Sequence, residues 1–245
     1  MSAGKVLIIL PSSRFLKLNN AQTCMVGYHL KELAVPVKHL RQNDYQVIIA
    51  TAGGETPFID PYSLSDVNVD ERLFYEILIK ENTQLLLPLS LERMSEEFLG
   101  TVDGVFIPGG YGSLIDFWSD PAIKHILKHM HKHSKPTAAI GHGVIAFAYE
   151  LQPEESWAYK DYQLTCTPES EDLQNEQTLL KGELTHHVSK RLELAGAKVQ
   201  FDPDNDQGFV LEDREVITGQ APSSSKALAL LFLDKLAYFQ RHRSC

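Results

Sequence analysis

The sequence predicts an α/β fold, with a doubly wound, mostly parallel sheet, helices on both faces and a small β-hairpin near the C-terminus. Apolar runs rich in β-branched residues alternate with stretches of helical periodicity, as in parallel sheets. The runs are apolar throughout, which is typical of strands buried on both faces. The chain has 245 residues, 43% of them hydrophobic, with no repeat or linker. That length supports one large core, so we expect a single domain over residues 1–245.

The predicted strands are short apolar runs that end near glycine, proline or polar residues. In chain order they are KVLIILP (5–11), QVIIATA (46–52), GVFIPGG (104–110), PTAAIG (136–141), YQLTC (162–166), KVQF (198–201), GFVLE (208–212) and EVITG (215–219). Only Asp213 and Arg214 join the last two, which indicates an antiparallel hairpin. The alternation of strands with helices predicts parallel pairing elsewhere, with right-handed crossovers.

Helical stretches lie between these strands. In chain order they are Val26 to Gln42, a stretch from about Asp120, HGVIAFAYEL (142–151), Leu179 to Ala195, and a C-terminal helix from about Ser223. Apolar residues recur near helical spacing, in the first at Leu30, Leu33, Val37 and Leu40 and in the last at Leu228, Leu231, Leu233 and Leu236. Pro36 predicts a kink or a second helix start. Asp120 followed by Pro121 is an N-cap with proline at the first helical position, and Gly196 ends the fourth helix.

Charge and hydrophobic pattern exclude several classes of protein. The chain carries 32 acidic and 23 basic side chains and a net charge of −9, whereas a general nucleic-acid binder shows a basic face. No run of about 18 apolar residues occurs, so we expect no transmembrane helix. The apolar run from Val6 to Pro11 is too short for a signal peptide and lacks a small-residue cleavage site. We therefore expect neither a nucleic-acid nor a membrane partner.

The cysteines predict a reducing, cytoplasmic compartment. There are three, Cys24, Cys166 and Cys245, an odd and low number that argues against a disulfide framework. They show no CxxC or Cys/His spacing, so we expect no bound metal.

Two clusters of titratable residues are interpreted as solvated surface. The histidines of KHILKHMHKHSK lie among lysines and predict the exposed face of a helix, where binding of nickel or zinc would be incidental; they are His125, His129, His131 and His133. The acidic stretch PESEDLQNE predicts a solvated loop or helix start, with a metal site as the minor alternative.

Ligands of doubly wound sheets bind outside the carboxyl ends of the strands. Three strand ends are therefore of interest, at residues 108–112, 140–143 and 218–220. The stretch AAIGHGVIAF has the form of a nucleophile elbow, a buried strand that turns sharply into a helix. A cysteine at such a turn would have a depressed pKa. The turn residue here is Gly141, which allows the geometry because glycine adopts positive φ readily, but which has no nucleophile.

Several motifs together resemble the ThiJ/PfpI (Parkinsonism-associated deglycase) superfamily, which is related to class I glutamine amidotransferase domains. The resemblance covers about residues 5–237 and is closer to the glyoxalase III and heat-shock chaperone branch. The motifs are GYHLKELAVP (27–36), ATAGGETPFIDPYS (50–63), FIPGGYGSLIDF (106–117), AAIGHGV (138–144) and ITGQAPSSS (217–225). Glycine at the elbow, in GHGV, is similar to a subgroup called glutamine amidotransferase-like class I domain-containing proteins.

The resemblance implies a flavodoxin-like fold and, in ordinary members, a cofactor-free Cys-His-Glu arrangement that acts on reactive carbonyls such as methylglyoxal. Glu32 matches the catalytic acid and His142 matches the histidine that follows the nucleophile. Gly141 stands where the nucleophile is expected, which removes covalent catalysis at that position. Loss of a catalytic nucleophile costs on the order of 10⁶ in kcat.

The loop PGGYG completes the implied site. Gly110 matches the residue whose backbone N–H contributes to an oxyanion hole, and Tyr111 and Gly143 are expected at the pocket. The segment fits neither GxGxxG nor GxxxxGK[ST], and backbone donors aimed at an oxygen fit it better. We expect no cofactor, a small carbonyl or carboxylate ligand, and a homodimer, since the superfamily usually dimerises.

Alternatives remain open for several residues. Glu32 is either a pocket acid or an ordinary carboxylate on a helix surface. Together with His142 it would form a remnant acid/base pair, or both would be retained scaffold. Cys24 and Cys166 are either displaced nucleophiles or, more commonly for buried cysteine, inert.

Three functions follow. In the favoured hypothesis, the chain is a pseudoenzyme without thiol chemistry, and its pocket or surface binds a small molecule or a partner. Alternatively, it is an active glyoxalase III/deglycase-like or hydratase/lyase-type enzyme that uses Glu32 and His142 as acid and base. The third hypothesis is a chaperone-like or assembly subunit, which needs no active site.

Overall fold

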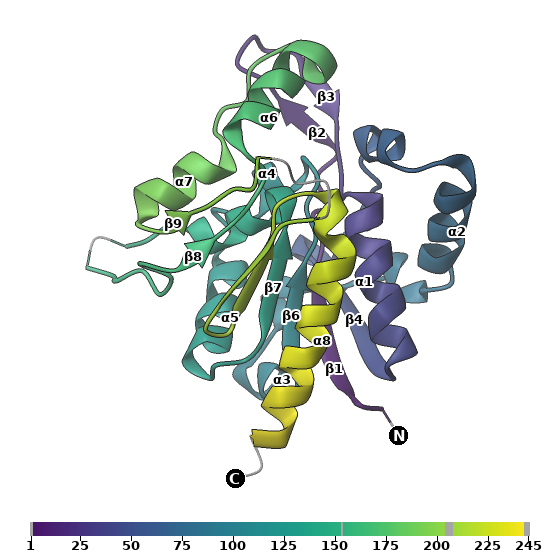
Figure 1. The fold of residues 1–245 in the computed structure, drawn as a ribbon, viewed down its shortest axis with the longest axis vertical. Coiled ribbons are helices and arrows are strands. Elements are labelled where there is room, and N and C mark those ends of the chain that lie inside the picture. Colours follow the sequence, from purple (N-terminus) through teal and green to yellow (C-terminus); the bar gives the residue numbers. More distant parts are fainter. Residues whose placement is uncertain (1, 153, 204–207, 243–245) are drawn as a thin grey trace.

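The computed structural model describes residues 2–152, 154–203 and 208–242, which form a seven-stranded sheet between helical layers (Figure 1). In spatial order the strands are β10 (Val210–Asp213), β11 (Val216–Gly219), β7 (Thr137–Ile140), β6 (Gly104–Ile107), β1 (Gly4–Ile9), β4 (Tyr45–Thr51) and β5 (Leu89–Ser90). Neighbours pair in parallel except β10 and β11, which form an antiparallel hairpin. The predicted flavodoxin-like α/β architecture is confirmed, including the hairpin near the C-terminus.

Helices and two small sheets complete the described part of the chain. The α-helices are α1 (Leu30–Gln42), α2 (Val69–Lys80), α3 (Glu96–Gly100), α4 (Ser113–Asp116), α5 (Pro121–Lys132), α6 (Glu169–Asn175), α7 (Val188–Ala195) and α8 (Ser225–His242). Short 3₁₀ segments cover Ala52–Gly54, Pro61–Asp66, Thr83–Leu85, Leu91–Arg93, Gly141–Ala148 and Pro222–Ser224, and a π-helical turn covers Glu176–Leu180. The small sheets pair β2 (Phe15–Lys17) with β3 (Thr23–Met25) and β8 (Gln163–Leu164) with β9 (Lys198–Val199). None of the described helices is both long enough and apolar enough to cross a membrane.

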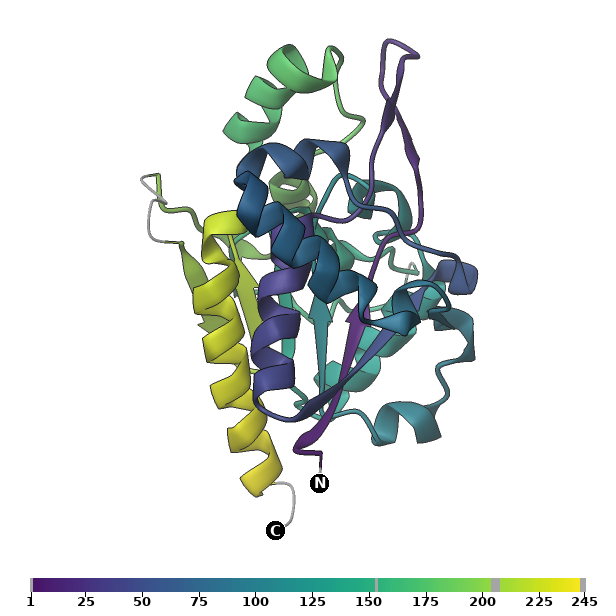
Figure 2. The same ribbon diagram turned by 90° about the vertical axis from the view of Figure 1, so that its right-hand side faces the viewer.

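The alternation of side chains along the strands divides the core into two layers. Val6 and Ile8 of β1 are fully buried in the layer formed by α1, α2 and α8. Leu7 and Ile9 point to the other face, where α5, α7 and the segment after β7 cover the sheet. Figure 2 shows α1 and α8 side by side over the first layer. Because both faces are covered, the strands are apolar throughout, as the sequence pattern indicates.

The first predicted helix is shorter than expected. α1 begins at Leu30, because the residues before it are extended and pair with a neighbouring segment. The backbone N–H of Tyr28 donates to the carbonyl of Phe58 at 2.8 Å, and that of Asp60 donates to the carbonyl of Tyr28 at 2.8 Å. Pro36 lies inside α1, so no second helix starts there.

The predicted helix from Leu179 to Ala195 is wrong in its first half. The π-helical turn ends at Lys181, whose φ of +59° breaks the helix. The buried carboxylate of Glu176 accepts the backbone N–H of Leu184 at 2.8 Å, which folds the chain back before α7. Gly196 ends α7 with a φ of +106°, as predicted. The predicted helix after β7 is a 3₁₀ segment, Gly141–Ala148.

The histidine-rich helix is only partly the solvated face that its lysines predict. α5 begins after the N-cap Asp120, as expected, and His125 and His133 are exposed. His129 is only 5% exposed because α3 packs beside it, and His131 is partly buried. The prediction of a fully exposed face is therefore wrong for these two residues.

Candidate active-site pocket

A small pocket lies at the carboxyl ends of the parallel strands, where the sheet topology predicts a ligand site. Its volume is about 160 Å³. The predicted site residues in its wall are Glu32, Gly110, Tyr111 and His142. These come from α1, from the loop after β6 and from the turn after β7. The fold therefore brings together residues from three segments that are far apart in the sequence.

Gly141 has the backbone conformation of a nucleophile elbow. It directly follows β7 and has a φ of +57°, in the left-handed region that side chains with a Cβ rarely adopt. A Cβ placed on Gly141 would lie 2.8 Å from Oε1 and 3.2 Å from Oε2 of Glu32. The Glu32 carboxylate thus lies in the space into which a side chain at the elbow would project.

Glu32 is a buried carboxylate and not a surface residue of its helix. It lies in the first turn of α1 and is 2% exposed. Its Oε2 accepts the backbone N–H of Gly109 at 2.7 Å, and the positive end of the α1 dipole favours a negative charge there. A Cβ on Gly109 would lie 2.6 Å from the same oxygen, so the close approach of α1 to this loop requires glycine.

His142 forms a buried pair with a residue that the sequence analysis missed. Its Nε2 lies 2.8 Å from Oδ1 of Asp172, which is in α6 and fully buried. The Tyr111 ring packs against the imidazole, with a centroid separation of 4.6 Å and an interplanar angle of 37°. Burial alone lowers the pKa of His142, but the neighbouring Asp172 carboxylate outweighs it, so the pKa lies above its ordinary value. The pair can therefore hold a proton close to the pocket.

Asp172 was missed because it lies in an acidic stretch that reads as solvated surface. The interpretation of PESEDLQNE as a solvated segment is wrong for Asp172 and for Glu176, which is 7% exposed. The two buried acids are four residues apart, which places them on the same side of the chain as it winds through α6 into the turn. This four-residue spacing is the signal in the sequence that could have indicated a shared, buried side for Asp172 and Glu176.

The loop after β6 is fixed by a buried carboxylate. Asp60 is 1% exposed, and it accepts backbone N–H groups from Tyr111 at 3.0 Å and from Tyr62 at 2.9 Å. Burial raises the pKa of Asp60, although these N–H groups oppose the shift. Gly110 has a φ of +105°, and a Cβ there would lie 2.3 Å from the carbonyl oxygen of Gly27. The loop conformation thus depends on glycine at position 110.

Tyr111 and Gly143 are both predicted at the pocket, but only Tyr111 lies in its wall. Tyr111 lines the pocket as expected and is 5% exposed. Gly143 is buried beside the pocket, where a Cβ would lie 2.5 Å from the carbonyl oxygen of Pro108. Its role is therefore close packing between the turn and the end of β6.

The described cysteines are buried thiols away from the elbow. Cys166 is fully buried with its Sγ 3.4 Å from the carbonyl oxygen of Thr167, and burial raises its pKa well above the ordinary value. Cys24 is buried with its Sγ 3.5 Å from the carbonyl oxygen of Leu180. Neither lines the pocket. Cys245 lies outside the described residues.

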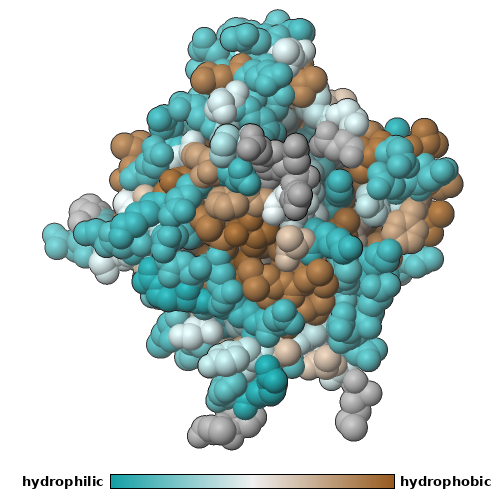
Figure 3. All heavy atoms as spheres, in the orientation of Figure 1, coloured by the Kyte–Doolittle hydropathy of each residue, from teal (hydrophilic) through white to brown (hydrophobic). Residues whose placement is uncertain are grey.

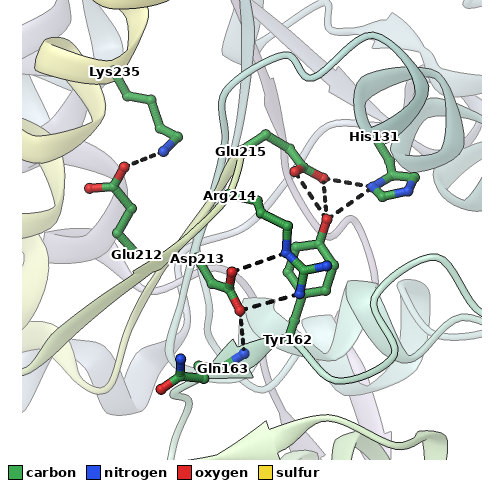
Figure 4. A network of polar contacts seen from close by, with 8 residues as sticks. All are labelled: His131, Tyr162, Gln163, Glu212, Asp213, Arg214, Glu215 and Lys235. Carbon is green, nitrogen blue, oxygen red and sulfur yellow. Dashed lines mark hydrogen bonds and ion pairs between the residues drawn. The ribbon is translucent and has the colours of Figure 1, made fainter.

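A larger open groove of about 1030 Å³ lies elsewhere, between α8 and the β10–β11 hairpin. Figure 3 shows hydrophobic side chains over this hairpin and the middle of α8. Figure 4 shows how the hairpin is fixed: Glu215 contacts His131 at 2.8 Å and the Tyr162 hydroxyl at 3.0 Å. Arg214 packs over the Tyr162 ring. The groove contains none of the predicted site residues, so its size alone does not make it the candidate site.

Comparison with known proteins places the chain in a family. The model of the DJ-1/PfpI family matches residues 23–235. The protein/nucleic acid deglycase HchA of Pseudomonas aeruginosa is 25% identical over 235 residues, which cover 93% of this chain and 79% of that protein. The same deglycase of Staphylococcus aureus is 24% identical, over 95% of this chain and 80% of that protein.

Solved structures show the same fold. Glyoxalase III of Candida albicans superposes with a TM-score of 0.77 and 19% identity, over 95% of this chain and 97% of that chain. Drosophila melanogaster DJ-1beta has a TM-score of 0.56 and 18% identity, over 98% and 97% of the two chains. Since the family model covers most of the sequence, the chain belongs to the DJ-1/PfpI family.

Proposed function

We propose that this chain binds a small carbonyl compound in the candidate pocket and performs no thiol chemistry there. The observation that carries the proposal is Gly141, which has the elbow conformation but no side chain. The carboxylate of Glu32 lies next to it and leaves no room for a Cβ without a shift. A covalent adduct at residue 141 cannot form, so the pocket retains recognition without the nucleophile.

The chemistry of the pocket wall favours a neutral ligand. Glu32, Asp60 and Glu171 contribute carboxyl groups. Neither lysine nor arginine occurs among the described residues that line the pocket. A carboxylate ligand would meet these carboxyl groups, and the charge of His142 is already compensated by its partner Asp172, which disfavours such a ligand. A pocket of about 160 Å³ fits a compound of a few carbon atoms, so we favour a small carbonyl over a carboxylate.

Methylglyoxal is a suitable probe for the test. Its binding is followed by changes in the amide NMR spectrum of the full chain, and its turnover by loss of the dicarbonyl from solution. We expect signals near Tyr111 and His142 to shift and turnover to stay at the level of the buffer. Metal-independent turnover that disappears in His142→Ala would refute the absence of catalysis. An unchanged NMR spectrum would refute the proposed ligand class.

A second candidate function, acid–base catalysis, is favoured by one specific observation. The buried Asp172 holds His142 at 2.8 Å and raises its pKa, and such a pair can donate a proton at neutral pH. Glu32 lines the same pocket and would act as the base. A screen of enolisable and hydrated carbonyls, with Glu32→Gln as the matched variant, tests this function. Equal rates for the wild type and Glu32→Gln on every compound would remove it.

Assembly and location are further parts of the proposal. We propose a cytoplasmic homodimer, which light scattering on a sizing column tests by the mass of the eluting species.

The relatives are called protein/nucleic acid deglycases, whereas the net charge of −9 disfavours contact with a polyanion. A DNA mobility shift at physiological salt would contradict the expectation of no nucleic-acid partner. Suppression of the aggregation of a test protein would favour the chaperone-like alternative.

A further inference from the structure

A second cluster of ligand-type side chains lies at the opposite end of the sheet from the pocket. It consists of Glu96, His129 and His133, defined here as the α3–α5 cluster. α3 ends shortly before β6 begins and α5 ends shortly before β7 begins, so the cluster lies at the amino ends of the strands (Figure 1). Each residue offers one ligand atom, and these atoms lie within 4.8 Å of one another.

The backbone sets the positions of the three side chains. Glu96 is in the first turn of α3, which the N-cap Ser95 fixes by accepting the backbone N–H of Phe98 at 3.2 Å. His129 and His133 are four residues apart at the end of α5 and so lie on the same side of the helix. Their rings are 4.5 Å apart between centroids, and Nδ1 of His129 lies 2.6 Å from Oε2 of Glu96.

The His129 ring has an unusual hydrogen-bond arrangement. The residue is 5% exposed, and its Nε2 is buried without a hydrogen-bond partner among the described residues. Nδ1 of His129 faces Glu96 and is the nitrogen that a metal ion shared with this carboxylate would contact.

We propose that the α3–α5 cluster binds one divalent transition metal ion of the zinc type. Two imidazoles and one carboxylate suit Zn²⁺, Cu²⁺ or Ni²⁺, whereas Mg²⁺ and Ca²⁺ prefer oxygen ligands alone. Three protein ligands leave a further coordination position for water. The sequence pattern indicates only incidental binding of nickel or zinc by the histidines of this helix; it does not indicate the contact with Glu96, which depends on the packing of α3 beside α5.

Basic side chains adjoin the cluster. Lys132 and Lys135 lie close enough to His133 for their positive charges to act on it. The Nζ of Lys135 is fixed by hydrogen bonds to the carbonyls of Leu99 and Val102 at 2.6 and 2.7 Å.

Metal titration of the untagged full chain tests the proposal. The protein is treated with a chelator, exchanged into metal-free buffer and titrated with Zn²⁺ by calorimetry and with Co²⁺ by visible absorption. The variants Glu96→Gln and His133→Ala each remove one ligand at an exposed position, so both should fold. His39→Ala is the matched control, since it removes a partly exposed histidine in the last turn of α1, on the other face of the sheet.

We expect one equivalent of Zn²⁺, a d–d absorption band for the Co²⁺ form, and affinity that falls by at least about tenfold in each ligand variant. His39→Ala should bind as the wild type does. The absence of saturable binding would overturn the proposal, and so would equal affinity in the wild type, Glu96→Gln and His133→Ala. A change in Tm in the variants without any effect of Zn²⁺ on the Tm of the wild type would identify the cluster as purely structural. None of these outcomes depends on the carbonyl pocket.

Discussion

Replacement of Asp172 tests whether the buried pair with His142 organises the pocket. The His142 side chain is 10% exposed, that of Asp172 is fully buried, and the two are joined at 2.8 Å. Removing one partner of a buried ion pair costs about 3–5 kcal/mol, because the other charge is left uncompensated. We therefore expect Asp172→Ala to lower the free energy of unfolding by this amount. Asp172→Asn keeps the volume and one hydrogen bond, so we expect a smaller loss of about 1–3 kcal/mol.

The pH dependence of this loss has a definite sign. The pKa of His142 in the folded protein lies above its ordinary value, which is about 6.5 in an unfolded chain. The charged pair therefore contributes its full stabilisation below about pH 6.5, and this part is lost as the pH rises through the folded-state pKa of His142. The difference in stability between the wild type and Asp172→Asn should be larger near pH 6 than near pH 9. In Asp172→Asn, burial should dominate and lower the pKa of His142.

Urea denaturation followed by circular dichroism measures the stabilities, and NMR titration of the His142 ring measures its pKa. Glu169→Gln is the control from the same helix, since its carboxylate is partly exposed and pairs with Lys190 at 3.1 Å; such a pair contributes about 0–1 kcal/mol. A loss below about 1 kcal/mol in Asp172→Ala, or a wild-type to Asp172→Asn difference that grows with pH, would refute the reasoning.

Three further predictions concern the elbow, the loop after β6 and the thiols. Gly141→Cys should lower the free energy of unfolding by about 1–3 kcal/mol, because position 141 has a positive φ and its Cβ would contact Glu32. A double-mutant cycle with Glu32→Ala, measured in urea, should show that alanine at position 32 recovers part of this loss. Asp60→Ala should speed hydrogen exchange of amides in the loop after β6 and cost about 1–3 kcal/mol, since it removes a buried acceptor of backbone N–H groups; unchanged exchange would contradict this role. Iodoacetamide should leave Cys166 and Cys24 unmodified in the native chain and label both in urea, as peptide mapping by mass spectrometry can show, because both are buried.

The fold could be predicted from sequence because its causes are local. Apolar runs such as β1 and β7 are hydrophobic on both sides, which only a sheet covered on both faces satisfies. Glycine at position 141 marks a positive φ directly after a buried strand. Glu32 and His142 lie in the same pocket, as the motif resemblance implies, while their catalytic roles stay predictions.

The missed features depend on contacts between distant elements. Nothing next to Asp172 in the sequence indicates that α6 folds over the turn after β7, so its charge reads as solvated. His129 is buried only because α3 packs beside α5, and the lysines around it indicate an exposed helix. The break at Lys181 follows from a carboxylate that bonds a backbone N–H eight residues later, which helical periodicity does not detect.

The packing of Tyr111 on His142 gives the pocket its own spectroscopic reporter. An aromatic ring whose centroid lies 4.6 Å from that of the imidazole, tilted by 37°, places the imidazole protons in its ring current, which displaces their resonances from those of solvated histidine. A ligand in the pocket would lie near these two rings, since both line it. The displaced His142 signal would therefore register occupancy even for a compound that has no chromophore and undergoes no reaction.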